Sequence, residues 1–246
     1  KIFSGLFTKK VDVQELVSTL KADMHSHLLP GIDDGSRDLQ NSLELVKGLV
    51  AKGYTKLVTT PHIMIERYRN TPEIIQGKLA ELRQFLQENG VSVQIEAAAE
   101  YMLDEGFPDK IKEGNLLTFG DKYILIETSF MVKPQNLTKV FFELKTQRFK
   151  PILAHPERYC YMWDSFSGYD ELKDAGFLFQ LNINSLSGVY SERAEKAARY
   201  LIKNRMIDFV GTDTHNEKHL ERLETAFQEK AIQNLIQSGD LLNFTL

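Results

Sequence analysis

Short apolar runs recur along this chain at intervals typical of alternating strands and helices. The runs of strand length lie near residues 21–25, 54–60, 91–99, 123–127, 149–154, 177–183 and 207–211. Between most of them, apolar residues recur every three or four positions, which indicates amphipathic helices. About seven strands alternating with helices predict parallel pairing through right-handed crossovers. The pattern therefore indicates an α/β fold, as either an open sheet or a closed barrel.

Two of the predicted helices carry end signals as well as an apolar stripe. The first begins near residue 39 and is ended by Gly53. In the second, Thr71 is a suitable N-cap, Pro72 suits the first turn, and Gly90 follows the last turn. Further helical patterns span about 137–144, 191–201 and 216–238. The stretch 101–122 favours no particular element.

Composition and charge limit the class of protein. With 246 residues, 42% of them apolar and 26% charged, the chain fits one large domain, which we place at residues 21–246 after an N-terminal extension of residues 1–20. The extension is expected to fray at its start. A net charge of −4 gives no electrostatic reason to bind nucleic acid. The single Cys160 and the lack of a long apolar run predict a cytoplasmic protein without a transmembrane segment.

Metal-binding side chains follow the end of nearly every predicted strand. The candidate ligands are His25, His27, Asp34, His62, Glu100, Glu127, His155, Asp213 and His215. In an open sheet a site draws on the few strands at a switch point, whereas a barrel brings all the carboxyl ends to one rim. We therefore predict a distorted TIM-like barrel built from seven strand–helix units, (β/α)7.

The spacing of these ligands points to a particular chemistry. His25 and His27 are two residues apart, so on a strand they share a face, and Asp213 with His215 repeats that spacing. Imidazole and carboxylate ligands without thiolates suit Mn²⁺, Fe²⁺ or Zn²⁺, and so many ligands suit two or three ions. Two ions about 3.5–4 Å apart can activate a hydroxide nucleophile and clamp a phosphoryl group. The sequence thus indicates phosphoester hydrolysis.

Some of the assignments have competitors. A single histidine at a strand end is more often a hydrogen-bonded polar residue than a ligand, but several at repeated positions favour ligands. Glu96 competes with Glu100, which is preferred because it lies at the end of its run. Asp33 competes with Asp34, and one of the two is expected to shape the following turn. Asp23 is expected to support a ligand or to accept a hydrogen bond at a strand end.

Arg158 is the predicted catalytic residue outside the metal ligands. It follows His155 by three positions, and its guanidinium could stabilise charge on a phosphoryl group. The alternative is a surface ion pair with Glu157 or Asp164. Solvent-exposed positions are expected for Arg67, Arg69, Arg193, Lys218, Arg222 and His219.

Cys160 does not fit a cysteine phosphatase, because the sixth residue after it is Phe166 rather than arginine. The chain also contains no Walker A loop, G-x-S-x-G elbow or G-x-G-x-x-G turn. These absences remove the usual nucleotide-binding and serine-hydrolase hypotheses.

Five short segments together resemble the polymerase-and-histidinol-phosphatase (PHP) superfamily. They are Asp23-Met24-His25-Ser26-His27, Asp33-Asp34-Gly35, Thr60-Pro61-His62, His155-Pro156-Glu157-Arg158 and Asp213-Thr214-His215. The resemblance covers about residues 21–230. It is closest to the manganese-dependent protein-tyrosine phosphatases of bacterial capsule and exopolysaccharide operons.

This resemblance implies a PHP-type barrel with a trinuclear site. The implied substrate is the phosphotyrosine tail of a membrane-associated bacterial tyrosine kinase. A second phosphate-binding arginine is expected soon after His215, where only Lys218 and Arg222 are available. Two other hypotheses remain: a phosphatase of the same superfamily that acts on histidinol phosphate or a sugar phosphate, and a metal-stabilised docking module without turnover.

Overall fold

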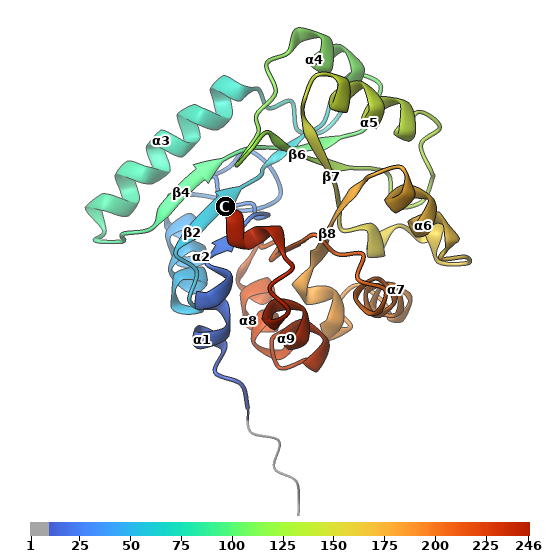
Figure 1. The fold of residues 1–246 in the computed structure, drawn as a ribbon. Helices are drawn as coiled ribbons and strands as arrows, with labels where there is room; N and C mark the ends of the chain where they lie inside the picture. The colour runs from blue at the N-terminus through green and yellow to red at the C-terminus, as the bar shows by residue number, and fades with distance from the viewer. Residues whose placement is uncertain (1–9) are drawn as a thin grey trace, which may run out of the picture.

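The strands of the protein run parallel to one another and are surrounded by helices (Figure 1). The computed structural model describes residues 10–246, so the expected fraying of residues 1–9 lies outside the described part. The strands are β1 Ala22–Asp23, β2 Lys56–Thr59, β3 His62–Ile63, β4 Gln94–Ala97, β5 Glu100–Met102, β6 Tyr123–Glu127, β7 Lys150–Ala154, β8 Leu178–Asn182 and β9 Phe209–Gly211. They form one sheet in the order β1-β2-β4 and another in the order β3-β5-β6-β7-β8-β9.

The two sheets are parts of one barrel. β2 and β3 are separated only by Thr60 and Pro61, and β4 and β5 only by Ala98 and Ala99, so each pair occupies one strand position. Hydrogen bonds continue through the interruptions, because Ala98 N–H donates to Thr59 and Glu100 N–H donates to Pro61. The described residues therefore contain seven strand positions.

Residues just beyond β1 and β9 close the barrel. Ser26 and Thr214 form a parallel bridge. Asp213 N–H donates to the carbonyl of His25 at 2.8 Å, and His27 N–H donates to that of Thr214 at 2.9 Å. The prediction of a distorted TIM-like barrel is confirmed.

The helices lie outside the strands. They are α1 Val13–Leu20, α2 Leu39–Ala51, α3 Pro72–Glu88, α4 Phe107–Glu113, α5 Leu137–Thr146, α6 Ser167–Asp174, α7 Glu192–Lys203, α8 Glu217–Ala226 and α9 Lys230–Gln237. The predicted caps are confirmed, since Thr71 accepts from Ile74 N–H and Ser191 from Ala194 N–H. Within the described residues, no helix has the length and apolarity to cross a bilayer.

The prediction of one helix over residues 216–238 is wrong. The chain turns between α8 and α9, where Phe227 is fully buried. The side chain of Gln228 bonds both the N–H and the carbonyl of Val11, at 3.0 Å each. The helix thus stops after Ala226, where Gln228 forms hydrogen bonds to a distant part of the chain.

Alternation along the strands separates two apolar cores. Ile124 and Ile126 of β6 and Leu153 of β7 belong to the large core under the helices, whereas Leu125 and Ile152 belong to a smaller cluster. Successive side chains of a strand point to opposite faces, so the smaller cluster fills the barrel interior. The same alternation points the side chain of Glu127, at the end of β6, to the inner face.

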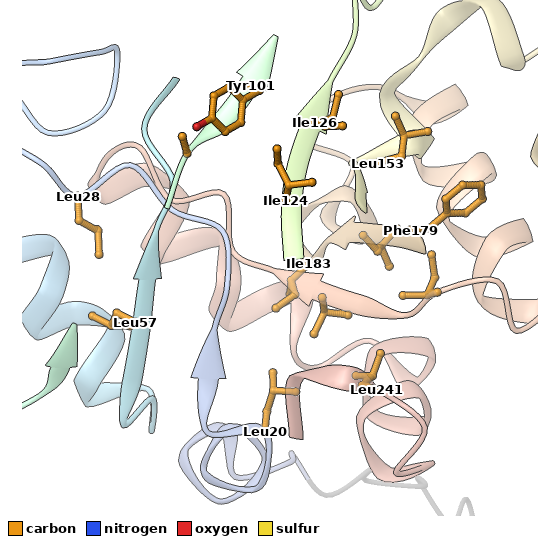
Figure 2. Packing of buried hydrophobic residues seen from close by; sticks show 14 of the residues in the cluster. Leu20, Leu28, Leu57, Tyr101, Ile124, Ile126, Leu153, Phe179, Ile183 and Leu241 are labelled. Carbon is orange, nitrogen blue, oxygen red and sulfur yellow. The ribbon is translucent and has the colours of Figure 1, made fainter. Parts of the chain in front are cut away.

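Part of the predicted N-terminal extension is packed against the barrel. Residues 13–20 form α1, which Asp12 caps, and the side chains of Val17 and Leu20 are fully buried. Figure 2 shows Leu20 beside the C-terminal turn Leu242–Thr245, which α1 contacts. The apolar spacing at 13, 16, 17 and 20 carried this signal in the sequence.

We predict that Leu20→Ala lowers the free energy of unfolding by about 2–5 kcal/mol, because it leaves a cavity in the core under α1. Gln14→Ala on the exposed face of the same helix is the control, with an expected change below about 0.5 kcal/mol. Urea unfolding followed by circular dichroism measures both. Equal midpoints for Leu20→Ala and Gln14→Ala would show that α1 adds nothing to the stability of the barrel.

Candidate metal centre

All nine predicted ligands meet at one rim of the barrel. They form four overlapping groups, within each of which the ligand atoms lie no more than 4.8 Å apart. The groups are His27, Asp34, His62 and His215; His25, Glu100 and His155; His25, His27 and Asp213; and His62, Glu100 and Glu127. Shared members join the groups into one cluster of imidazoles and carboxylates.

The strand ends position these side chains. His62 and Glu100 begin β3 and β5 and are paired with each other across the sheet, and Glu127 ends β6. His155 and Asp213 follow β7 and β9 with φ angles of 31° and 50°. Such left-handed conformations are unfavourable for residues other than glycine and concentrate at functional sites.

Several buried polar atoms of the cluster have no hydrogen-bond partner among the described residues. Glu100 Oε2 is buried and forms no hydrogen bond, although it lies 3.2 Å from both His25 Nε2 and His62 Nδ1. Glu127 Oε1 and His62 Nδ1 are likewise buried without a hydrogen bond, 3.0 Å apart. Ligand bonds of about 2.0–2.2 Å place neighbouring ligand atoms about 3.0–3.5 Å apart, so these contacts match the edges of coordination shells. The donor set therefore fits divalent ions.

Two neighbouring side chains orient the first histidine pair. His25 Nδ1–H donates to Gln180 Oε1 at 2.8 Å, and His27 Nδ1–H donates to Asp33 Oδ2 at 2.8 Å. In the neutral imidazoles each Nε2 then has its lone pair facing the cluster. The sequence analysis did not predict a role for Gln180. The feature that could have pointed to it is its polar side chain within the otherwise apolar run of β8.

In the Asp33-Asp34-Gly35 turn, one aspartate shapes the turn and the other faces the cluster, as the sequence predicted. Asp33 Oδ1 accepts from Gly35 N–H at 3.0 Å, while Asp34 Oδ1 lies 3.4 Å from His62 Nε2. A Cβ atom on Gly35 would lie 2.2 Å from the carbonyl oxygen of His27, so only glycine fits there. Asp33 thus shapes the turn and supports His27, whereas Asp34 faces the cluster.

Glu96 and Asp23 lie outside the groups of candidate ligands. Glu96 is partly exposed and pairs with Lys56 at 3.0 Å. Asp23 is buried and accepts from both the N–H and the hydroxyl of Thr212 at 2.9 Å, which joins β1 to the end of β9. Burial raises the pKa of Asp23 to about 6, and the two Thr212 hydrogen bonds oppose the rise.

The charge balance of the cluster favours bound cations. Burial lowers the pKa of His25, but the carboxylates of Glu100 and Asp213 outweigh it and raise the pKa to about 9. Burial raises the pKa of Glu100, yet His25 and His62 hold it well below its usual range. Converging carboxylates need positive charge, which protons or metal ions can supply.

Arg158 lies at this cluster rather than on the surface. Its Nη1 donates to Asp213 Oδ2 at 3.1 Å, and its guanidinium carbon lies 4.5 Å from the ring centre of Phe130 and 4.2 Å from that of Tyr190. Neither expected surface partner pairs with it. Glu157 is buried and accepts from Asn182 N–H and the Ser185 hydroxyl, and Asp164 pairs with Arg193.

A pocket of about 480 Å³ opens over the cluster. Aromatic walls missed in the sequence are contributed by Tyr68, Phe130 and Tyr190, from the loops after β3, β6 and β8. Arg67 is exposed, as expected, and also lines the pocket, whereas His219, expected on the surface, lines the pocket and is only partly exposed. Neither Lys218 nor Arg222 is among the lining residues. Tertiary position, and not nearness to the ligands in sequence, decides which cations reach the pocket.

The fold and the site define the class: a parallel α/β barrel with a histidine and carboxylate cluster at its carboxyl rim. Within that class the chain belongs to the capsular polysaccharide synthesis CpsB/CapC family, whose sequence profile matches residues 21–237. The family resemblance predicted from the motifs is thereby confirmed.

Individual relatives agree with this assignment. The tyrosine-protein phosphatase YwqE of Bacillus subtilis is 28% identical over 229 residues, which cover 89% of this chain and 90% of YwqE. The putative tyrosine-protein phosphatase CapC of Staphylococcus aureus is 28% identical, over 79% of this chain and 76% of its own.

Solved structures show the same likeness. The first comes from a description of YwqE of B. subtilis and CpsB of Streptococcus pneumoniae as unique metal-dependent tyrosine phosphatases. It superposes with a TM-score of 0.76 and is 27% identical in sequence, covering 90% of this chain and 94% of its own. The histidinol phosphate phosphatase of Lactococcus lactis shares the fold alone, with a TM-score of 0.51 and 15% identity over 86% of this chain and 93% of its own.

We predict that Asp33→Ala weakens Mn²⁺ binding by about 10–100-fold, because His27 loses the acceptor that orients it. Asp33→Asn should weaken binding less, since its amide oxygen can still accept from His27. Equilibrium dialysis against Mn²⁺ measures the affinity. Asp104→Ala is the matched control, because Asp104 also accepts backbone N–H groups in a turn but lies outside the ligand groups. Unchanged affinity in Asp33→Ala would remove Asp33 from the support of the site.

Proposed function

We propose that this protein is a metal-dependent phosphatase that hydrolyses phosphotyrosine on a bacterial tyrosine kinase and so regulates capsular or exopolysaccharide synthesis. The observation that carries the proposal is the opening of the ligand cluster into a pocket with aromatic walls and an arginine at its base. Membership of the capsular polysaccharide synthesis family supports the biological setting.

We propose two or three divalent ions, with Mn²⁺ preferred, held by the nine residues of the cluster. Mixed imidazole and carboxylate ligands suit Mn²⁺, and they also admit Fe²⁺ or Zn²⁺. When bound, such ions supply Lewis acidity that activates water and neutralises phosphoryl charge.

Arg158 is proposed as the catalytic residue of the chain itself. Two aromatic rings hold its guanidinium, and Asp213 accepts from Nη1 alone, so the other N–H groups can donate to phosphoryl oxygens. Asn182 Nδ2 donates to the same Asp213 oxygen at 2.7 Å and keeps that carboxylate in place. Charge that grows on the phosphoryl group in the transition state would meet a donor already in position.

The pocket walls suit the phenyl ring of phosphotyrosine. Tyr68, Phe130 and Tyr190 offer aromatic surface against which a phenyl group can pack. The leaving phenoxide has a pKa of about 10, so its departure needs no strong general acid. An aryl phosphate is therefore favoured over an alkyl phosphate such as histidinol phosphate.

The partner proposed for this site is the phosphotyrosine tail of a membrane-associated kinase. Its tail would be reached from the cytoplasm, which we propose as the location of the enzyme. The single cysteine, Cys160, is unpaired and half-buried, which suits a reducing compartment.

We predict that Arg158→Ala lowers kcat/KM for a phosphotyrosyl peptide by about 10²-fold or more, because one stabiliser of transition-state charge is lost. Metal content should stay the same, since Arg158 belongs to none of the ligand groups. Arg193→Ala is the control, an exposed arginine paired with Asp164. Unchanged turnover in Arg158→Ala would remove this residue from the mechanism.

Metal removal gives a second prediction. Protein stripped of metal should not hydrolyse a phosphotyrosyl peptide, and Mn²⁺ should restore turnover. His27→Ala and Asp213→Ala should lose both metal and activity, as measured by elemental analysis and phosphate release, because each removes a proposed ligand.

Two substrates run beside the peptide separate the competing hypotheses. Preference for histidinol phosphate over the phosphotyrosyl peptide would replace the proposed substrate while keeping the site. No turnover of phosphotyrosyl peptide, phosphoseryl peptide or histidinol phosphate would favour a docking module. Full metal occupancy in His27→Ala or Asp213→Ala would contradict the ligand assignment.

A further inference from the structure

Arg67 is a cation at the pocket that the proposed reaction does not use. It lies in the loop between β3 and α3, lines the pocket and is exposed. Its guanidinium forms no ion pair with a carboxylate among residues 10–246. The neighbouring Arg69 differs, because its Nε donates to the carbonyl of Ile65 at 2.7 Å and it does not line the pocket.

Arg67 contacts an aromatic ring that in turn stacks on a candidate ligand. The guanidinium carbon lies 5.2 Å from the ring centre of Tyr68. The ring of Tyr68 in turn stacks on that of His62, with centres 5.4 Å apart and an angle of 10° between their planes. Cation–π contact places the guanidinium over the ring and leaves its N–H edge free to donate.

This geometry separates the tasks of the two arginines. Arg158 contacts Asp213 directly and lies where a phosphoryl group would bind. Arg67 contacts Tyr68, which stacks on His62, and among residues 10–246 no hydrogen bond or ion pair joins Arg67 itself to a candidate ligand. We therefore assign to Arg67 an anion other than the phosphoryl group at Arg158.

We infer that Arg67, supported by Tyr68, binds an anionic group on a residue close to the phosphotyrosine of a peptide substrate. This inference rests on the proposed phosphatase function. The planar guanidinium fits a carboxylate or a second phosphoryl group equally well, because both present paired oxygens. The subsite makes the enzyme prefer phosphotyrosines with an acidic residue or another phosphotyrosine beside them.

Three phosphotyrosyl peptides test the inference. They are identical except for the neighbouring residue, which is glutamine, glutamate or a second phosphotyrosine. For the Mn²⁺-loaded wild-type enzyme, kcat/KM should be about two- to fivefold higher with glutamate than with glutamine, as expected for a partly exposed ion pair. Whichever anionic peptide shows the larger gain identifies the source of the anion.

In Arg67→Ala, kcat/KM should be the same for the anionic and the neutral peptides. In Arg69→Ala, the higher kcat/KM for the anionic peptides should be retained. Arg67→Glu should reverse the preference, so that a lysine-flanked peptide is hydrolysed faster than a glutamate-flanked one. Turnover of p-nitrophenyl phosphate checks that each variant is folded and loaded with metal.

Two failures can be told apart. If the wild-type enzyme hydrolyses all three peptides at the same kcat/KM, or if Arg67→Ala keeps the full ratio, the subsite is refuted while the phosphatase function stands. If no phosphotyrosyl peptide is hydrolysed, the proposed function itself fails.

Discussion

Closure of the barrel between its first and last strands is the constraint on which the site depends. Backbone hydrogen bonds from Asp213 to His25 and from His27 to Thr214 join segments almost a chain length apart. Asp23 strengthens the same seam through the backbone and hydroxyl of Thr212. Without this closure, two ligand pairs with the same spacing would lie at opposite edges of an open sheet.

The closed rim concentrates groups that are costly to bury. Buried polar atoms without hydrogen bonds destabilise a fold, and Glu100 Oε2 and Glu127 Oε1 are two such atoms. The left-handed backbone at His155 adds strain of about 1–3 kcal/mol for a residue of its kind. The two apolar cores stabilise the barrel against these costs, and bound cations would remove much of the electrostatic part.

The pocket combines parts of different origin. Strand ends and the segments that follow β1 and β9 supply the candidate ligands. The loops supply the aromatic walls and both arginines, and these can vary without disturbing the barrel. Both guanidinium groups make cation–π contacts, Arg158 with two rings and Arg67 with one. Candidate ligands, aromatic side chains and both arginines thus line one pocket at the rim.

The sequence alone determined the order of the strand positions, the barrel and the nine residues that meet at its rim, whereas α4 and the break between α8 and α9 were decided by the structure. It could do so because alternation and helical spacing are local, and because a polar side chain at the end of an apolar run is visible without coordinates. Only the tertiary structure decided that Gln180 supports His25, that Arg158 contacts Asp213, and that Arg67 reaches the pocket. These contacts join residues far apart in the chain, and their geometry follows from barrel closure and loop conformation, which no periodicity encodes.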